Sequence, residues 1–211
     1  MEKIIIPFGE ECYTCQSIDS KFTDNSFRKY GFPFDYVGHT YIENIYDNLF
    51  DLLNSNEYCC LIDDFSKQLF GEKYFMCHKK YEFKYWHDVD SLNNEINIYD
   101  NEIINFIEKY NRRYERLKYY LKTSENITIL SVNHFDNIYA KSFKQKSIYK
   151  LFDLLKLYNN NIKFIAVNFG EEIYNKHDLQ FVNLPINYHL SFTESKQEFT
   201  KHLYDFIKST M

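Results

Sequence analysis

Two cysteines spaced three positions apart are the most chemically suggestive feature of the chain. Cys12 and Cys15 follow the stretch "IIIPFGEE", in which apolar residues lead to a glycine and two glutamates. The apolar run predicts a short buried strand over residues 3–8, and a helix over residues 12–22 that begins soon after it. A thiol in the first turn of a helix lies near backbone N–H groups that lower its pKa and can bind an oxyanion.

Three kinds of thiol chemistry fit this spacing. The C-x-x-C pattern at a helix start is typical of a redox pair, but Glu10 and Glu11 precede Cys12 directly and would raise a thiol pKa through like-charge repulsion. A zinc site would need a second close pair of ligands, and the available pairs are adjacent residues, which point to opposite faces of a strand. Those pairs are drawn from Cys59, Cys60, Cys77 and His78. We therefore predict no metal site.

The third chemistry is a single nucleophile at Cys12, which needs a base that a carboxylate or amide orients. His87 in "KYWHDVD" is followed by Asp88, and His134 in "VNHFD" is the second candidate. The hypothesis is a catalytic set of Cys12, His87 and Asp88, with the backbone around Glu11 stabilising an oxyanion. A buried cysteine is otherwise an inert small hydrophobe, and that alternative stays open.

The hydrophobic pattern predicts the elements that position these residues. Strands 127–135 and 162–170 flank a helix over residues 148–158, which makes a βαβ unit and implies a parallel pair. We predict a single α/β domain over residues 1–211 with a mainly parallel, Rossmann-like sheet flanked by helices, in preference to a papain-like α+β arrangement. The remaining predicted elements are helices over 41–53, 103–121 and 194–207, strands over 57–62 and 185–192, a loop over 31–36, and one or two strands within 71–86.

Chemistry in such sheets gathers beyond the carboxyl ends of the strands. By that rule the positions of interest are residues 9–15, Asp63 and Asp64, residues 133–136 including His134, and Asn168. We predict that His134 and Asn168 bind substrate there.

Arginines on the long predicted helix offer a second kind of binding chemistry. Arg112 and Arg116 are four positions apart and share a face, and Arg113 borders the apolar stripe. Guanidinium groups bind a phosphate or carboxylate in bidentate fashion, so these arginines are candidate substrate ligands. They could equally pair with Glu108, Glu115 or Asp35 and fix the helix against a loop.

Composition excludes several partners. The net charge is −5 and no basic stripe is present, so we expect no nucleic-acid ligand. No stretch approaches the ~20 apolar residues that span a bilayer, so we expect no membrane insertion. Five cysteines without scaffold-like spacing predict reduced thiols and a cytoplasmic protein. The codon bias implied by abundant Asn, Lys, Ile and Tyr suits a large DNA virus, with a host-cytoplasmic location, or a low-GC bacterium. No cofactor is predicted.

Five segments, in order, resemble a bacterial and viral family described as papain-like cysteine peptidases. They are "FGEEC", "FPFDY", "NLFDLL", "YWHD" and "YNRRYERL", and with the later strands they cover roughly residues 5–170. The resemblance implies that Cys12 is the nucleophile and His87 its base. It also implies that Asp35, Arg112, Arg113 and Arg116 belong to the family's signature.

These observations favour a thiol-dependent hydrolase or acyl-transferring enzyme. Its substrate would be a small molecule, a peptide or another acyl compound, and the oligomeric state is not predicted. Two alternatives from other classes stay open. One is a non-catalytic binding protein of viral or bacterial origin, and the other is a Rossmann-like domain that binds a phosphate or nucleotide.

Overall fold

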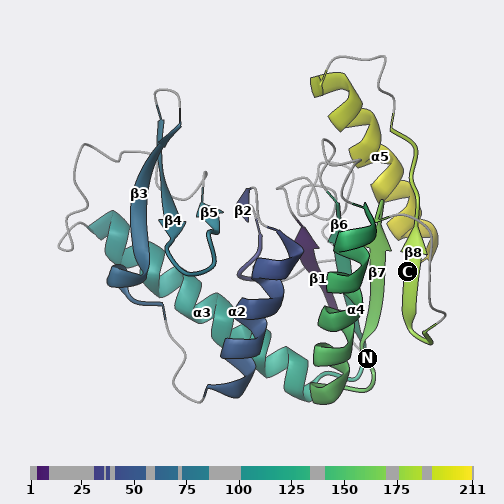
Figure 1. Ribbon diagram of the computed structural model, residues 1–211, viewed down its shortest axis with the longest axis horizontal. Helices are drawn as coiled ribbons and strands as arrows, with labels where there is room; N and C mark the ends of the chain where they lie inside the picture. The colour runs from purple at the N-terminus through teal and green to yellow at the C-terminus, as the bar shows by residue number, and fades with distance from the viewer. Residues whose placement is uncertain are drawn as a thin grey trace.

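The computed structural model contains two sheets and four long helices among the residues that it describes (Figure 1). Those residues are 4–9, 31–35, 37–38, 41–55, 60–70, 73–85, 101–133, 141–169, 176–186 and 192–210 of the chain.

The first sheet is parallel throughout and has the order β1-β6-β7-β8. Its strands are β1 (Ile4–Gly9), β6 (Ile127–Val132), β7 (Lys163–Val167) and β8 (Leu179–Val182). All six residues of β6 are buried, which explains why this strand reads as a continuous apolar run. The α/β class and the mainly parallel sheet predicted from the sequence are confirmed.

Helices cover both faces of the parallel sheet. Helix α4 (Lys141–Tyr158) connects β6 to β7 and completes the predicted βαβ unit. It packs on one face beside α2 (Ile42–Asn54) and α3 (Asn101–Thr123), and α5 (Phe192–Thr210) covers the other face. None of the described helices is both long enough and apolar enough to cross a membrane.

The two faces are separated by the alternation of side chains along each strand. In β1, Ile4, Ile6 and Phe8 join the core cluster that includes α2, α3 and α4, whereas Ile5 joins the cluster formed with α5. The same period of two holds in β6. The opening "IIIPF" is therefore apolar throughout because both of its faces are covered.

The second sheet is antiparallel and has the order β2-β5-β4-β3. It packs on α3 through aromatic rings: the centroids of Phe65 and Phe106 are 5.2 Å apart, and those of Tyr85 and Tyr110 are 4.5 Å apart. These rings belong to the same cluster as Ile6 of β1, so one continuous core joins the two sheets. The strands are β2 (Val37–Gly38), β3 (Phe65–Phe70), β4 (Lys73–His78) and β5 (Lys84–Tyr85).

The long helices match the predicted periodicity, but two predicted strands do not. Cys60 and Leu61 are not in a strand, and Ile62–Asp64 form a 3-10 turn. The prediction of a strand over residues 57–62 is therefore wrong for residues 60–62, which are the part that the structure describes. The last strand of the parallel sheet in the described residues is Leu179–Val182. Of the strand predicted over residues 185–192, residues 185–186 are not in a strand and Phe192 begins α5, and residues 187–191 lie outside the described residues. Residues 12–22, predicted as a helix, lie outside the described residues.

Candidate functional site

The carboxyl ends of the parallel strands lie level with one another. Gly9 pairs with Val132, Val132 pairs with Val167, and Val167 pairs with Val182, so β1, β6, β7 and β8 end along one edge (Figure 1). We call this the carboxyl edge. In α/β sheets ligands bind beyond that edge, so it is the first place to look for a site.

Three predicted site residues belong to the segments that leave this edge. Cys12 comes three residues after the end of β1, His134 comes two residues after the end of β6, and Asn168 follows β7 directly. Glu11, Cys12, His87, Asp88 and His134 themselves lie outside the described residues. Their roles therefore stay predictions, and the described strands show where their segments begin.

A single buried ring connects the segments that precede Cys12 and His87. Phe34 contacts Phe8 at 5.0 Å and Phe83 at 5.5 Å between ring centroids, both in edge-to-face geometry. Phe8 is four residues before Cys12, and Phe83 is four residues before His87. Phe34 thus holds the parallel sheet and the antiparallel sheet together where both chain segments depart. Phe34 belongs to "FPFDY", and the sequence of this segment gives no signal of the bridging role.

Asn168 has a strained backbone and fastens the carboxyl edge. Its φ of 61° is in the left-handed region, which asparagine tolerates better than most residues. Its carbonyl accepts a hydrogen bond from Asn133 Nδ2 at 2.9 Å, and its Oδ1 accepts one from the Leu184 N–H at 2.8 Å. Two asparagines therefore link the exits of β6 and β7 to the segment after β8. Backbone strain of this kind gathers at functional sites.

Polar atoms without partners lie near the same edge. Ser131 Oγ is fully buried with no hydrogen-bond partner, and so is Asn168 Nδ2, both within the described part of the chain. Ser131 lies between Phe8 and Ala166 in register, two residues before Asn133. A buried polar atom without a partner costs about 1–3 kcal/mol. The only sequence signal for Ser131 is that one hydroxyl interrupts the apolar run "ITILSV".

The N-terminal halves of α4 and α2 also contribute polar groups that are buried or partly buried. Ser147 of α4 donates a hydrogen bond to Glu43 Oε1 of α2 at 2.7 Å, and Gln145 is buried one turn before Ile148. Because α4 follows β6 and precedes β7, its N-terminal turn lies at the carboxyl edge. Helix N-termini present N–H groups and a partial positive charge, which suit a carbonyl or an anionic oxygen.

Asp35 and two of the predicted arginines form a separate group around Gly31. Asp35 is fully buried, and its Oδ2 accepts a hydrogen bond from the Phe32 N–H at 2.5 Å. Arg116 Nη1 donates to the Gly31 carbonyl at 2.6 Å. A Cβ added at Gly31 would lie 3.1 Å from Arg113 Nε and 3.3 Å from Asp35 Oδ2, so both side chains border this glycine.

These contacts fix the loop over residues 31–35 to α3. This structural role is the alternative to substrate binding that the sequence left open for the arginines. Arg113 also lies over the Tyr110 ring, with Cζ 5.2 Å from the centroid. Arg112 has a different partner, the exposed carboxylate of Glu108 at 3.6 Å. Substrate binding by Asp35, Arg112, Arg113 or Arg116 stays a prediction.

Asp63 and Asp64 were predicted to follow a strand of the parallel sheet, and this prediction is wrong. They lie in the 3-10 turn before β3, where Asp64 Oδ2 accepts a hydrogen bond from the Leu61 N–H at 2.7 Å. Lys79 Nζ donates to the Asp63 carbonyl at 2.6 Å. This pair shapes a turn of the antiparallel sheet.

Several candidate metal ligands have structural roles. His78 is buried, and its Nδ1 accepts hydrogen bonds from the backbone N–H groups of Lys80 at 3.2 Å and Tyr81 at 3.4 Å. Burial lowers the pKa of His78 to about 4, so the ring is neutral. Burial raises the pKa of the Cys77 thiol. Among the described residues, no three His, Cys, Asp or Glu side chains gather to hold a metal ion.

Comparisons with family models, with curated proteins and with solved structures found no match to the chain.

Proposed function

We propose that the protein is a thiol-dependent hydrolase or acyl-transferring enzyme that works at the carboxyl edge of the parallel sheet. The observation that carries the proposal is the level ending of β1, β6 and β7, since the segments that contain Cys12 and His134 leave from adjacent strands there. The contacts of Phe34 with Phe8 and Phe83 also support the proposal that the segment containing His87 begins near the end of β1. The resemblance to a family of cysteine peptidases supports the same chemistry.

In this reaction the Cys12 thiolate attacks an acyl carbon, and His87 holds the proton that the thiol has lost. Backbone N–H groups around Glu11 stabilise the oxyanion that forms. Collapse of the intermediate breaks the bond to the leaving group, which takes the proton from His87 and leaves a thioester. Water, or another acceptor, then attacks the thioester while His87 accepts its proton, and the thiolate is regenerated. Asp88 orients the imidazole.

His134 is the second candidate for the base. Its segment begins at Val132, the register partner of Gly9 on the strand that leads to Cys12. Neighbouring strands are about 4.8 Å apart, so adjacency favours His134, whereas the resemblance favours His87. Asn168 and Asn133 would position the substrate in either case, because their amides fasten the edge from which all these segments leave.

We also propose that the protein works in the cytoplasm, in the host cytoplasm if it is viral. Cys60 and Cys77 are buried and reduced, which agrees with a reducing compartment.

Mapping of alkylated cysteines tests the proposal. Under native conditions iodoacetamide should modify Cys12 first, and mass spectrometry of the peptides locates the label. Cys12→Ala should abolish the fast phase, whereas the matched control Cys15→Ala should leave it unchanged. Cys60 and Cys77 should react only after unfolding, because both are buried. Equal labelling of the two single variants would contradict a unique nucleophile.

A ligand-binding role without catalysis is the second candidate, and the parallel sheet with helices on both faces favours it. In such folds phosphates bind at the carboxyl edge beside helix N-termini. A rise in melting temperature with inorganic phosphate or ATP, together with no preferential alkylation of Cys12, would favour this candidate over the enzyme.

A further inference from the structure

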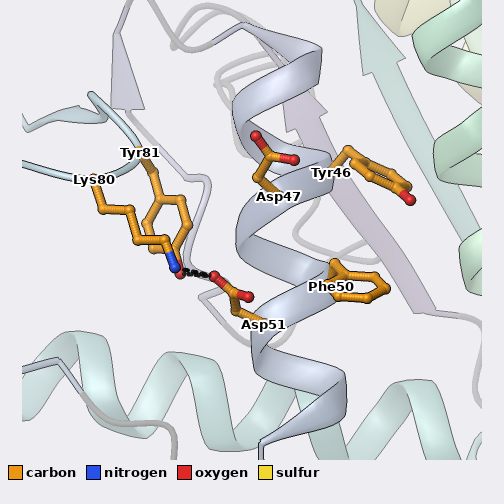
Figure 2. A pocket seen from close by; sticks show the side chains of 6 residues that line it. All are labelled: Tyr46, Asp47, Phe50, Asp51, Lys80 and Tyr81. Atoms are coloured by element: carbon orange, nitrogen blue, oxygen red, sulfur yellow. Dashed lines mark hydrogen bonds and ion pairs between the residues drawn. The ribbon is translucent and has the colours of Figure 1, made fainter.

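A surface pocket lies away from the carboxyl edge, between α2 and the turn that joins β4 to β5. Its volume is ≈ 390 Å³, which is within the range of ligand-binding pockets. In Figure 2 the side chain of Asp51 reaches toward Lys80 and Tyr81, Asp47 lies one helical turn away from it, and Tyr46 and Phe50 point to the side of α2 away from the turn. The other lining residues are Lys80 and Tyr81 of the turn.

Lys80 lies in this pocket and shows that the pocket can bind a cation. Lys80 Nζ is 2.5 Å from Asp51 Oδ2, and Tyr81 OH donates to the same oxygen at 2.6 Å. The ammonium also lies 5.3 Å from the centroid of the Tyr81 ring. Partial burial tends to raise the pKa of Asp51, but the hydrogen bonds from Lys80 and Tyr81 outweigh it and lower the pKa. Asp51 is thus ionised and holds one cation beside an aromatic ring.

Asp47 is a second carboxylate, one helical turn before Asp51, and no cation of the described residues pairs with it. Its side chain is exposed and makes no hydrogen bond or ion pair within the described part of the chain. Side chains four apart on a helix are about 5–6 Å apart at Cβ, and like charges there repel. Among the described residues, the pocket therefore has two carboxylates and one ammonium, which leaves these lining residues with a net negative charge.

Aromatic rings complete the wall. Tyr46 and Phe50 stack with centroids 6.3 Å apart and planes 28° apart, and Phe50 is 47% exposed. Phe50 and Asp47 are three positions apart and therefore neighbours on the surface of α2, so one organic cation can contact both the exposed ring and the carboxylate. A guanidinium suits this pair better than an ammonium, because it is planar, weakly hydrated and able to stack on the ring while it donates to the carboxylate. Two carboxylates supply fewer oxygens than the six or more that Ca²⁺ requires.

We propose that this pocket binds the guanidinium of an arginine side chain that a partner polypeptide presents. The guanidinium pairs with Asp47 and stacks on Phe50, while Lys80 stays on Asp51. The negative charge of the pocket agrees in sign with the chain's net charge of −5, so the chain as a whole also attracts a basic partner. This interaction is independent of thiol chemistry at Cys12.

The test is an NMR titration of the ¹⁵N-labelled full chain with the peptide acetyl-Gly-Arg-Gly-amide. The comparison peptide carries citrulline, which is nearly isosteric with arginine but neutral. The arginine peptide should shift the amide signals of α2 around Tyr46 and Phe50, and the citrulline peptide should shift them much less. Free arginine has the same net charge as the peptide but lacks the peptide backbone, so it should bind more weakly if the partner is a polypeptide.

Two variants locate the interaction. Asp47→Asn should weaken binding of the arginine peptide about threefold to fivefold, in line with an exposed ion pair. The matched control Asp205→Asn removes an exposed carboxylate of α5 and should leave the affinity unchanged. Both changes are nearly isosteric and on the surface, so both variants should fold, which circular dichroism checks.

Three results would overturn the proposal. The first is equal binding of the arginine and citrulline peptides. The second is equal affinity of the Asp47→Asn and Asp205→Asn variants. The third is binding of free arginine as tight as that of the peptide, which would replace the partner polypeptide by a small molecule.

Discussion

The carboxyl edge of the parallel sheet and the turns of the antiparallel sheet treat buried polar groups differently. In the antiparallel sheet, His78 Nδ1 accepts two backbone hydrogen bonds and Asp64 closes the turn before β3. At the carboxyl edge, Ser131 Oγ and Asn168 Nδ2 are buried without partners in the described part of the chain. The polar groups of the antiparallel sheet therefore maintain the shape of its turns.

The difference supports the proposal that a ligand binds at the carboxyl edge. Most buried polar atoms in proteins have hydrogen bonds, so an exception needs an explanation. Local violations of such rules concentrate at functional sites. Asn168 also has a left-handed backbone at this edge, as Glu82 has in the turn between β4 and β5, so the backbone alone does not separate the two regions. We infer that these polar groups of the antiparallel sheet stabilise its turns, and that the proposed chemistry takes place at the carboxyl edge of the parallel sheet.

Removal of the ring that joins the two regions should have the largest effect. Phe34 is 2% exposed and packs against Phe8, Phe83 and Tyr114. Phe34→Ala should lower the free energy of unfolding by about 3–5 kcal/mol, because it removes a buried ring and leaves a cavity. Urea denaturation measures the change, and Phe34→Leu is the control with a smaller loss. A cost below about 1 kcal/mol would show that the two sheets do not depend on this ring.

The supporting role of His78 makes stability depend on pH. The folded pKa is about 4, below the ordinary value of 6.5, because burial disfavours the charged ring. The unfolded chain therefore takes up the proton first. Stability is complete above pH 6.5 and falls by up to about 3 kcal/mol as the pH drops toward 4.

Urea denaturation between pH 7 and pH 4 measures this loss, and NMR titration of the His78 ring measures its pKa directly. His78→Asn keeps an acceptor for the two turn N–H groups but cannot titrate, so its pH dependence should be weaker. A His78 pKa of 6 or above would contradict the buried, neutral ring.

Gly31 tests the link between the 31–35 loop and α3. A Cβ there would lie 3.1 Å from Arg113 Nε, and the end of a long side chain can move aside. Gly31→Ala should therefore cost about 1 kcal/mol. In an Arg113→Ala background the same change should cost less, so a double-mutant cycle should give a coupling between the two sites. Strict additivity would mean that Arg113 does not confine Gly31.

Ser131 should show the smallest effect, and its sign matters. Ser131→Ala removes a buried hydroxyl that has no hydrogen-bond partner among the described residues, so the free energy of unfolding should stay constant or rise by about 1 kcal/mol. Asn133→Ala is the contrasting variant, because it removes the hydrogen bond to the Asn168 carbonyl and should destabilise the fold. Destabilisation of more than about 1 kcal/mol by Ser131→Ala would show that this hydroxyl supports the fold, and the contrast between the two regions would weaken.

Most of the fold follows from periodicity, and its errors have local causes. The long helices and the βαβ unit have strong periodic patterns. Strand β8 was missed because it is a short edge strand in which only Leu179 is buried. Residues 57–62 suggested a strand because they are apolar. Instead, the side chain of Asn111 bonds both the N–H and the carbonyl of Cys60, in place of a neighbouring strand.

The candidate site was less predictable, because its contacts join distant parts of the chain. Asn168 was found from its place after an apolar run, since strand exits can be read from sequence. The same holds for the separate pocket beside α2: the contact between Asp51 and Lys80 joins residues 29 apart, and nothing in the local pattern of either residue indicates it. The bridging role of Phe34 has no sequence signal beyond its presence in "FPFDY", because a ring's neighbours depend on the packing of two sheets.

The pH dependence of Cys12 alkylation tests the central claim most directly. A thiol paired with an imidazole should react with iodoacetamide with an apparent pKa well below the ordinary value of about 8.5. His87→Ala, or His134→Ala if that residue is the base, should return the apparent pKa to about 8.5. If Cys12 titrates near 8.5 in the unmodified chain and neither histidine variant changes its rate, the thiol-enzyme proposal is wrong.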